Sequence, residues 1–424
     1  MIRVAIIGNG VTGVAAALRL RELQPEWEIV MISGESTYHY SRPALMYVFM
    51  GHMRYQDTKP YEDSFWDQKR IELVRDWVVG LDAEAGQLTL KKRGTLHFDK
   101  LLLATGSKSN KFGWPGQNLD GVQGLYDLMD LKRLYDNVKG AEHGVIVGGG
   151  LIGIEFAEML HSRGVHVTLL VRESSYWNNV LPSEESELVN RVIREAGMDL
   201  QLETELVEIV GNDAGRAVSV KTNRGDTLPC QVVGLTAGVH PNVDLVRDSG
   251  IDVGRGILVN RQLETNVPNV YAAGDCAEIV VPDAERNWLE QVWYTGKAQG
   301  RHVAESMCGD DKEYSPGIWY NSAKFLDLEY QVYGAVNRRL ADEKNFYWQH
   351  PSEPKSIRLV YDDEKILGFQ TMGVRYRHRV CERWLAEERP IDYVVEHLAE
   401  ANFDPEFFMQ YESDVRQAFG RVNA

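Results

Sequence analysis

A Gly-x-Gly-x-x-Gly pattern occurs twice in this chain, at residues 8–13 and at residues 148–153. Each copy follows an apolar run typical of a buried strand and leads into small and apolar residues typical of a helix start. A strand, tight turn and helix of this kind place the pyrophosphate of a dinucleotide at the helix N-terminus. The two copies therefore predict two dinucleotide-binding folds in one chain.

The glycines of the first copy have different roles. Gly8 permits the tight turn, Gly10 lets the backbone approach the phosphates, and Gly13 lets the helix pack closely on its strand. After the next apolar run, residues 28–32, Glu35 stands at about the spacing of a carboxylate that accepts hydrogen bonds from ribose hydroxyls. A solvated turn residue is the alternative for Glu35.

In the second copy, the residues after the predicted strand 166–171 select the nicotinamide cofactor. Arg172 is suited to a 2′-phosphate, whereas Glu173 accepts from a free 2′-hydroxyl and repels a phosphate. Because Gly153 is retained and Glu173 has nearly the expected spacing, we favour NADH and leave NADPH open. A surface arginine without a ligand is the alternative for Arg172.

Composition narrows the class of protein. A length of 424 residues predicts two or three domains. The net charge of −16 argues against nucleic-acid binding and against adsorption to an anionic membrane. No apolar run approaches membrane-spanning length, and the first predicted strand begins almost at once, which leaves no room for a cleaved signal sequence. We expect a cytoplasmic protein without membrane insertion.

The four cysteines stand at positions 230, 276, 308 and 381. They are too widely spaced for a Cys-x-x-Cys redox pair or a zinc knuckle. We expect buried thiols and no metal site.

A third pattern ends in Gly274 and Asp275, which follow an apolar run. The glycine admits a ligand close to the backbone, and the carboxylate of Asp275 can accept from a polyol such as the one that flavin carries. The alternative is an Asp cap on a helix that starts at this point, and the two interpretations are compatible.

Several motifs follow one another in an order typical of the FAD-dependent pyridine nucleotide oxidoreductases. They are the first glycine loop, Ala104-Thr105-Gly106, the second glycine loop, residues 238–242 and the Gly274-Asp275 pair. The chain resembles this superfamily over about residues 1–335. Residues 40–45, Tyr-Ser-Arg-Pro-Ala-Leu, resemble the Arg-Pro segment of the ferredoxin reductase, rubredoxin reductase and nitrite reductase flavoprotein group. The resemblance implies an α/β fold with two Rossmann-like dinucleotide-binding domains, one inserted in the other, and a C-terminal α+β domain.

The resemblance also implies domain limits. The FAD-binding domain is discontinuous, with residues 1–112 and 240–312, and the NAD(P)H-binding domain takes residues 113–239. Residues 313–424 form an α+β interface domain with a helical tail.

The family's functional residues map onto this chain as implied positions. Those for FAD are Gly8, Gly10, Thr12 and Gly13 at the pyrophosphate, Glu35 at the ribose, Arg42 and Pro43 along the flavin, Asp275 on the ribityl chain, and Val11, Ala104, Thr105, Gly106, Gly274, Gln291 and Val292 near the cofactor. Gly238 is a further implied cofactor-binding position. Those for the nicotinamide dinucleotide are Gly148, Gly150, Leu151, Ile152 and Gly153 at its loop, Arg172 and Glu173 at its ribose, and Glu155 near the carboxamide.

Two of these expectations have structural alternatives. Glu155 is otherwise an exposed first-turn glutamate favoured by the helix dipole. Trp293 is expected close to the flavin and nicotinamide rings, and is otherwise a plain helix-face tryptophan that sequence cannot separate from Tyr294.

The chain departs from the disulfide reductase and peroxidase branches of the superfamily because it has no cysteine near position 45. Electrons should therefore leave directly from the flavin. Leu45-Met46-Tyr47 also replaces the Leu-Ser-Lys of many ferredoxin reductase relatives.

The C-terminal region is predicted to contain a hairpin, residues 356–361 and 366–373. The basic cluster from Arg375 to Arg383 either pairs with acidic residues of this chain, which we favour, or docks an acidic electron carrier. The apolar face formed by Ile391, Val394, Val395 and Leu398 packs on its own domain or forms a subunit interface, so a homo-oligomer is left open.

We expect an FAD-dependent NAD(P)H oxidoreductase that passes electrons to a small carrier such as a ferredoxin or rubredoxin, with no catalytic side chain because the flavin performs the hydride transfer. The alternative is a regulatory or assembly flavoprotein in which reduction by NADH switches conformation or partner binding. Quinone reduction is a third alternative.

Overall fold

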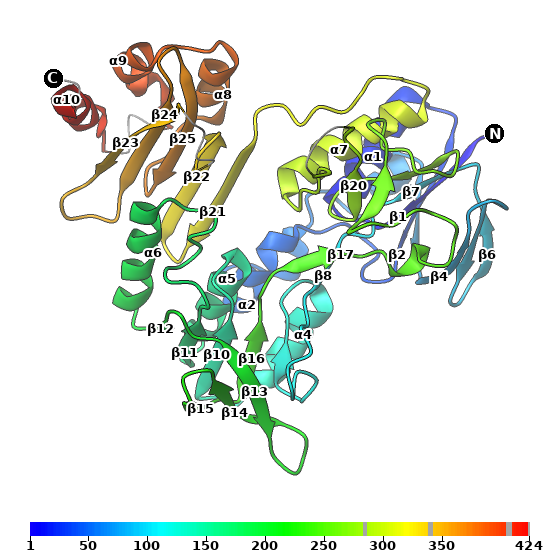
Figure 1. The fold of residues 1–424 in the computed structure, drawn as a ribbon. Helices are drawn as coiled ribbons and strands as arrows, with labels where there is room; N and C mark the ends of the chain where they lie inside the picture. The colour runs from blue at the N-terminus through cyan, green and yellow to red at the C-terminus, as the bar shows by residue number, and fades with distance from the viewer. Residues whose placement is uncertain (283–285, 338–341, 404–408, 423–424) are drawn as a thin grey trace. The chain divides into compact units, whose positions relative to one another are not determined.

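The computed structural model describes residues 1–282, 286–337, 342–403 and 409–422. The chain divides into two compact units (Figure 1). Each unit has its own parallel sheet and its own buried core. The first unit is Met1–Phe112, Gln123–Lys139 and Gly238–Pro316, and the second is Gly113–Val122, Gly140–Ala237 and Gly317–Ala424.

A five-stranded parallel sheet forms the centre of the first unit, in the order β19-β7-β1-β2-β3. Because all five strands run the same way, the loops after their carboxyl ends gather at one edge, where α/β sheets bind ligands. The strands are β1 (Arg3–Ile7), β2 (Glu28–Ser33), β3 (Ile71–Arg75), β7 (Lys100–Leu103) and β19 (Val270–Ala272).

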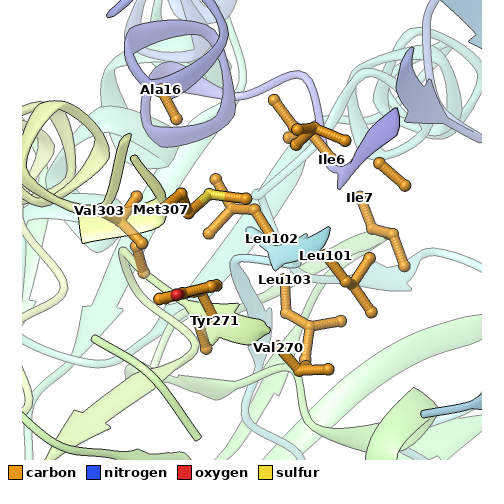
Figure 2. Packing of buried hydrophobic residues seen from close by; sticks show 14 of the residues in the cluster. Ile6, Ile7, Ala16, Leu101, Leu102, Leu103, Val270, Tyr271, Val303 and Met307 are labelled. Atoms are coloured by element: carbon orange, nitrogen blue, oxygen red, sulfur yellow. The ribbon is translucent and has the colours of Figure 1, made fainter. Parts of the chain in front are cut away.

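Helices α1 (Val11–Leu23) and α7 (Trp293–Met307) pack on this sheet and against each other. Figure 2 shows Ala16 of α1 and Val303 and Met307 of α7 beside the central strands. The two helices approach closely because small residues face each other: a Cβ at Gly300 would lie 2.4 Å from the carbonyl oxygen of Thr12. The apolar runs of β1 and β7 are buried, as expected for central parallel strands.

The remaining elements of the first unit are short. They are η1 (Arg42–Ala44), α2 (Leu45–Met50), η2 (Tyr55–Thr58), α3 (Phe65–Gln68), β4 (Val78–Asp82), β5 (Gln87–Leu90), β6 (Gly94–His97), β8 (Ser107–Ser109), α4 (Leu128–Asn137), β17 (Val239–Pro241), η3 (Asp244–Val246), β18 (Ile257–Val259) and β20 (Ala277–Ile279).

The second unit repeats the same plan. Its sheet has the order β12-β11-β10-β16-β9, and β10, the strand before the second glycine loop, pairs in parallel with β11 and β16. The elements are β9 (Val122–Gln123), β10 (His143–Val147), α5 (Leu151–His161), β11 (His166–Leu170), α6 (Ser183–Glu195), β12 (Asp199–Gln201) and β16 (Val232–Leu235), with an antiparallel sheet of β13 (Leu206–Gly211), β14 (Ala217–Thr222) and β15 (Thr227–Pro229).

The C-terminal part of the second unit is an antiparallel sheet, β21-β22-β25-β24-β23, accompanied by helices. The predicted hairpin is confirmed as β24 and β25. The elements are β21 (Tyr320–Phe325), β22 (Leu328–Gly334), β23 (Lys344–Gln349), β24 (Ser356–Tyr361), β25 (Ile366–Met372), α8 (His378–Ala386), α9 (Ile391–Ala401) and α10 (Glu412–Val422).

The apolar face of α9 and two arginines of the basic cluster make contacts within the unit. The apolar face of α9, with Val394, Val395 and Leu398, is buried in the same core as the sheet. In the basic cluster, Arg375 forms an ion pair with Glu329 of β22, and Arg383 pairs with Glu400 of α9 at 2.8 Å. These arginines therefore serve the fold of this unit.

Ion pairs connect the C-terminal sheet to the second dinucleotide fold. Arg358 of β24 donates to Glu185 of α6 at 2.8 Å, and both side chains are almost fully buried. The same guanidinium reaches Glu184 at 2.8 Å. Lys324 of β21 pairs with Glu158 of α5 at 2.7 Å. Buried charges need such partners, because an unpaired one would cost several kcal/mol.

The architecture is therefore α/β, with two parallel-sheet dinucleotide folds and a C-terminal α+β part, as predicted. Within the described ranges, every helix is too short or too polar to cross a membrane. In those same ranges no cluster of His, Cys, Asp and Glu could hold a metal ion. All four cysteines are free thiols, and three of them are buried.

Candidate functional site

The first glycine loop has the geometry that its pattern predicts. Gly8 has a φ of +111°, and a Cβ there would lie 2.1 Å from the carbonyl oxygen of Ala104. A Cβ at Gly13 would lie 2.0 Å from the carbonyl oxygen of Gly8. Both positions therefore need glycine for the fold itself.

Gly10 differs from Gly8 and Gly13, the other two glycines of the pattern. Its φ is −71°, which any residue adopts, and a Cβ there would meet nothing within 4 Å. The residue precedes α1, whose first turn has no side-chain cap. Open space in front of the uncapped amides of a helix N-terminus is what a bound pyrophosphate requires. Thr12 and Gly13 are buried, and Val11 is half-buried at the start of the helix.

Glu35 lies in a network of hydrogen bonds beyond the end of β2. Its carboxylate pairs with Arg42 at 2.9 Å and accepts from the Leu128 amide at 2.9 Å and from the Tyr40 hydroxyl. Burial alone would raise the pKa of Glu35, but Arg42 and these donors outweigh burial and hold the pKa below its usual value. Glu35 is thus a fixed carboxylate, unlike the solvated turn residue of the alternative interpretation.

Arg42 also binds the loop before α4. It donates to the carbonyl oxygen of Tyr126 at 2.8 Å, and its guanidinium lies 4.6 Å from the centre of the Tyr126 ring. Pro43 follows it in the short helix η1. No sequence pattern pointed to Tyr126 or Leu128, because both reach this place through tertiary packing from a distant segment.

A second polar cluster surrounds Asp275. The Ser107 hydroxyl donates to the Asp275 carboxylate at 3.0 Å, and the Gln291 amide donates to the Ser107 hydroxyl at 2.6 Å. Burial raises the pKa of Asp275 despite the opposing effects of Ser107 and Arg42. The helix that we expected after Asp275 is absent: the chain continues into strand β20, so the helix-cap interpretation is wrong. The half-buried Asp275 carboxylate caps no helix, and its oxygens can accept from a ligand hydroxyl as well as from Ser107.

The other predicted residues of the first unit lie around these two clusters. The Thr105 hydroxyl donates to the Asn242 carbonyl oxygen at 2.7 Å, joining the Ala-Thr-Gly turn to the segment after Gly238. Positive φ values at Gly106 (+70°), Gly238 (+85°) and Gly274 (+79°) explain why these turns carry glycine. Val292 precedes α7, and Trp293 begins it with 41% of its surface exposed.

The second glycine loop repeats the geometry of the first. Gly148 has a φ of +127°, and a Cβ there would lie 2.7 Å from the carbonyl oxygen of Thr236. A Cβ at Gly153 would lie 2.6 Å from the carbonyl oxygen of Gly148. At Gly150 a Cβ would meet nothing within 4 Å, and α5 begins with Leu151 and Ile152 without a side-chain cap.

Glu155 lies on α5 near this loop. Burial raises its pKa to about 7, Glu158 adds to the shift, and Lys324 opposes it. The alternative interpretation of an exposed first-turn glutamate is wrong, because Glu155 is half-buried and lies after the first turn of α5. The Tyr176 hydroxyl donates to the Gly150 carbonyl oxygen at 2.8 Å and so stabilises the loop. No sequence pattern identified Tyr176 as a residue of this site.

The two residues expected at the nicotinamide-side ribose are bound to each other. Arg172 pairs with Glu173 at 2.8 Å, and their side chains are 71% and 33% exposed. The arginine is therefore engaged by the acid that would disfavour a 2′-phosphate.

Known proteins resemble this chain in sequence and in fold. The rubredoxin-NAD(+) reductase of Acinetobacter baylyi is 31% identical over 284 residues, which cover 65% of this chain and 72% of that protein. The rhodocoxin reductase of Rhodococcus erythropolis is 28% identical over 95% of this chain and 93% of its own length. A ferredoxin reductase structure from Rhodopseudomonas palustris matches with a TM-score of 0.80 and 25% identity, covering 88% of this chain and 91% of its own.

A family model gives the same result over most of the chain. Residues 2–303, which include both glycine loops and the Asp275 cluster, match the model of the pyridine nucleotide-disulphide oxidoreductases. This match together with the paired glycine loops establishes the relationship, and the chain belongs to the pyridine nucleotide-disulphide oxidoreductase family.

Proposed function

We propose that this chain is an FAD-dependent NAD(P)H oxidoreductase that delivers electrons to a small electron-carrier protein. The observation that carries the proposal is the open space at Gly10 and Gly150, each in front of an uncapped helix N-terminus. Two such spaces in one chain fit two dinucleotides. The names of the relatives, rubredoxin and rhodocoxin reductases, support the class of acceptor.

The residues of the first unit fit FAD. The amides at the start of α1 would hold its pyrophosphate, Glu35 its adenosine ribose and Asp275 its ribityl hydroxyls. Arg42 and Pro43 would lie along the flavin. We assign residues 1–112 and 240–312 to the FAD-binding domain and residues 313–424 to an interface domain.

The residues of the second unit fit a nicotinamide dinucleotide. The start of α5 would hold the pyrophosphate, and Glu155, whose pKa is raised, would orient the carboxamide. We assign residues 113–239 to this domain. NADH is the favoured donor because Glu173 both engages Arg172 and repels a 2′-phosphate.

The chemistry needs no protein nucleophile. When bound, a flavin accepts a hydride and releases electrons one at a time. The chain contributes binding, orientation and electrostatics, and its four free cysteines lie at position 230 and beyond. We therefore propose direct electron release to the carrier, without a redox-active disulfide.

An anaerobic titration tests the proposal. The purified protein is titrated with NADH and, in parallel, with NADPH while the flavin absorbance band is recorded. We expect stoichiometric bleaching by NADH, followed by reoxidation when rubredoxin or ferredoxin is added. A protein that binds no FAD, or a flavoprotein that neither nucleotide reduces, would contradict it. Slow reoxidation by every carrier, with a changed oligomeric state, would favour the regulatory alternative.

A further inference from the structure

Trp77 is an exposed tryptophan at the ligand-binding edge of the first parallel sheet. It follows β3 directly after Asp76, and 54% of its surface is exposed. Among the described residues, it has no aromatic or cationic side chain stacked against it. More than half of the indole is therefore open to a flat ligand ring.

The indole of Trp77 lies over the segment that follows β2. A Cβ built at Gly34 would be 2.1 Å from Cδ2 of Trp77 and 2.4 Å from Cε2. The φ of Gly34 is not in the left-handed region, so glycine is needed there for the indole and not for the backbone. The next residue is Glu35, the carboxylate proposed for the adenosine ribose.

The backbone around Trp77 is held firmly. The buried Asp76 carboxylate accepts from the amides of Trp77 at 2.8 Å, Lys92 at 3.0 Å and Arg93 at 3.1 Å. The Asp76 amide donates to the carbonyl oxygen of Ser33 at 3.1 Å. These bonds tie the end of β3 to the end of β2 and fix the backbone from which the indole extends.

The contact with Gly34, next to Glu35, favours a purine ring as the occupant of the exposed indole face. In a dinucleotide bound at this edge, the adenine follows the ribose away from the pyrophosphate. Gly34 directly precedes Glu35, the residue proposed for the ribose, and Trp77 packs on Gly34. A purine offers a flat π face that stacks well on an indole. We propose that Trp77 is the stacking surface for the adenine ring of FAD, an inference that rests on the proposed function.

The test compares three variants of the apoprotein. Trp77→Leu keeps apolar bulk without a π face, Trp77→Phe keeps an aromatic face, and Gly34→Ala keeps the indole but displaces it. Affinities for FAD and for ADP are measured by calorimetry, and the thermal unfolding of each apoprotein is recorded. ADP serves as a probe because it carries the adenine, the ribose and the pyrophosphate without the flavin.

We expect Trp77→Leu to weaken both FAD and ADP about 5- to 100-fold, the range for loss of one base stack. Trp77→Phe should retain most of the affinity, and Gly34→Ala should behave like Trp77→Leu. Equal FAD and ADP affinities in wild type and Trp77→Leu, with normal unfolding, would overturn the inference and leave the proposed function standing. Wild-type apoprotein that binds neither FAD nor ADP would overturn both.

Discussion

The two glycine loops are alike in backbone and different in what surrounds them. In both, the first and third glycines are required by close carbonyl oxygens, while the middle glycine borders open space. The acid after the second strand differs: Glu35 is 14% exposed in its side chain and held by Arg42, whereas Glu173 is 33% exposed and paired with the 71% exposed Arg172.

This difference matches two kinds of ligand. A carboxylate fixed by several partners is preorganised, and preorganisation lowers the cost of binding. Such a site suits a cofactor that stays bound, and a loosely held surface pair suits a nucleotide that binds and leaves in each cycle. The comparison gives five predictions, in order of decreasing effect.

Gly10→Val should abolish FAD retention. The new side chain fills the space proposed for the pyrophosphate, and we expect at least ~100-fold weaker FAD binding, equivalent to about 2.7 kcal/mol. Because a Cβ at Gly10 meets nothing within 4 Å, the apoprotein should unfold at the wild-type temperature. Gly8→Val is the contrast, since its φ and its contact with Ala104 predict a folding defect. A Gly10→Val protein that purifies with full flavin would refute the site.

Gly150→Val tests whether the two glycine loops bind different ligands. We expect the variant to retain FAD but to bind NADH at least ~30-fold more weakly, equivalent to about 2 kcal/mol. The measurement is the NADH concentration that gives half-maximal anaerobic flavin reduction. Loss of flavin from this variant would show that the two loops do not have separate ligands.

Arg42→Met should destabilise the apoprotein by about 1–3 kcal/mol, because it leaves the Glu35 carboxylate without its cation. The pKa of Glu35 is lowered in the folded protein, so the stabilisation is present above the unfolded pKa of about 4.3 and is lost as the pH falls through the folded value. Urea unfolding at pH 7 and pH 4 measures the difference. Arg54→Met, which breaks the exposed pair with Asp57, should have almost no effect at either pH.

Glu155→Gln should stabilise the protein more at pH 8 than at pH 5. The pKa of Glu155 is raised to about 7, so its buried charge costs stability as the pH rises through that value. After allowance for partial exposure, we expect a gain on the order of 1 kcal/mol at pH 8. Glu158→Gln, which breaks the ion pair with Lys324, should instead destabilise the protein. An identical Glu155→Gln effect at both pH values would contradict the assignment.

Glu173→Gln should give the smallest effect, since the pair is exposed. Removing the charge frees Arg172 and ends the repulsion of a 2′-phosphate, and we expect the preference for NADH over NADPH to fall about fivefold, or about 1 kcal/mol. Arg172→Gln is the matched control and should leave NADH binding nearly unchanged. The ratio of dissociation constants for the two nucleotides decides the outcome.

Sequence by itself determined the parts that depend on neighbours along the chain. The two glycine loops, their strands and helices, and the hairpin of β24 and β25 follow from local periodicity and turn residues. The glycine requirement at Gly8 and Gly13 was readable because the contacts are made within one strand-loop-helix unit or with an adjacent strand.

Tertiary structure decided what each charged side chain meets. The Leu128 amide on Glu35, the Ser107 hydroxyl on Asp275 and the Lys324 ammonium that acts on Glu155 come from segments far away in sequence. The same holds for Trp77, because its contact with Gly34 joins residues from two different strand ends. The pKa and the exposure of a side chain depend on burial and on nearby groups from other elements. Local sequence patterns specify neither the burial nor these groups. The prediction of a helix after Asp275 was wrong for the same reason. Pairing of β20 with β18 makes that segment a strand.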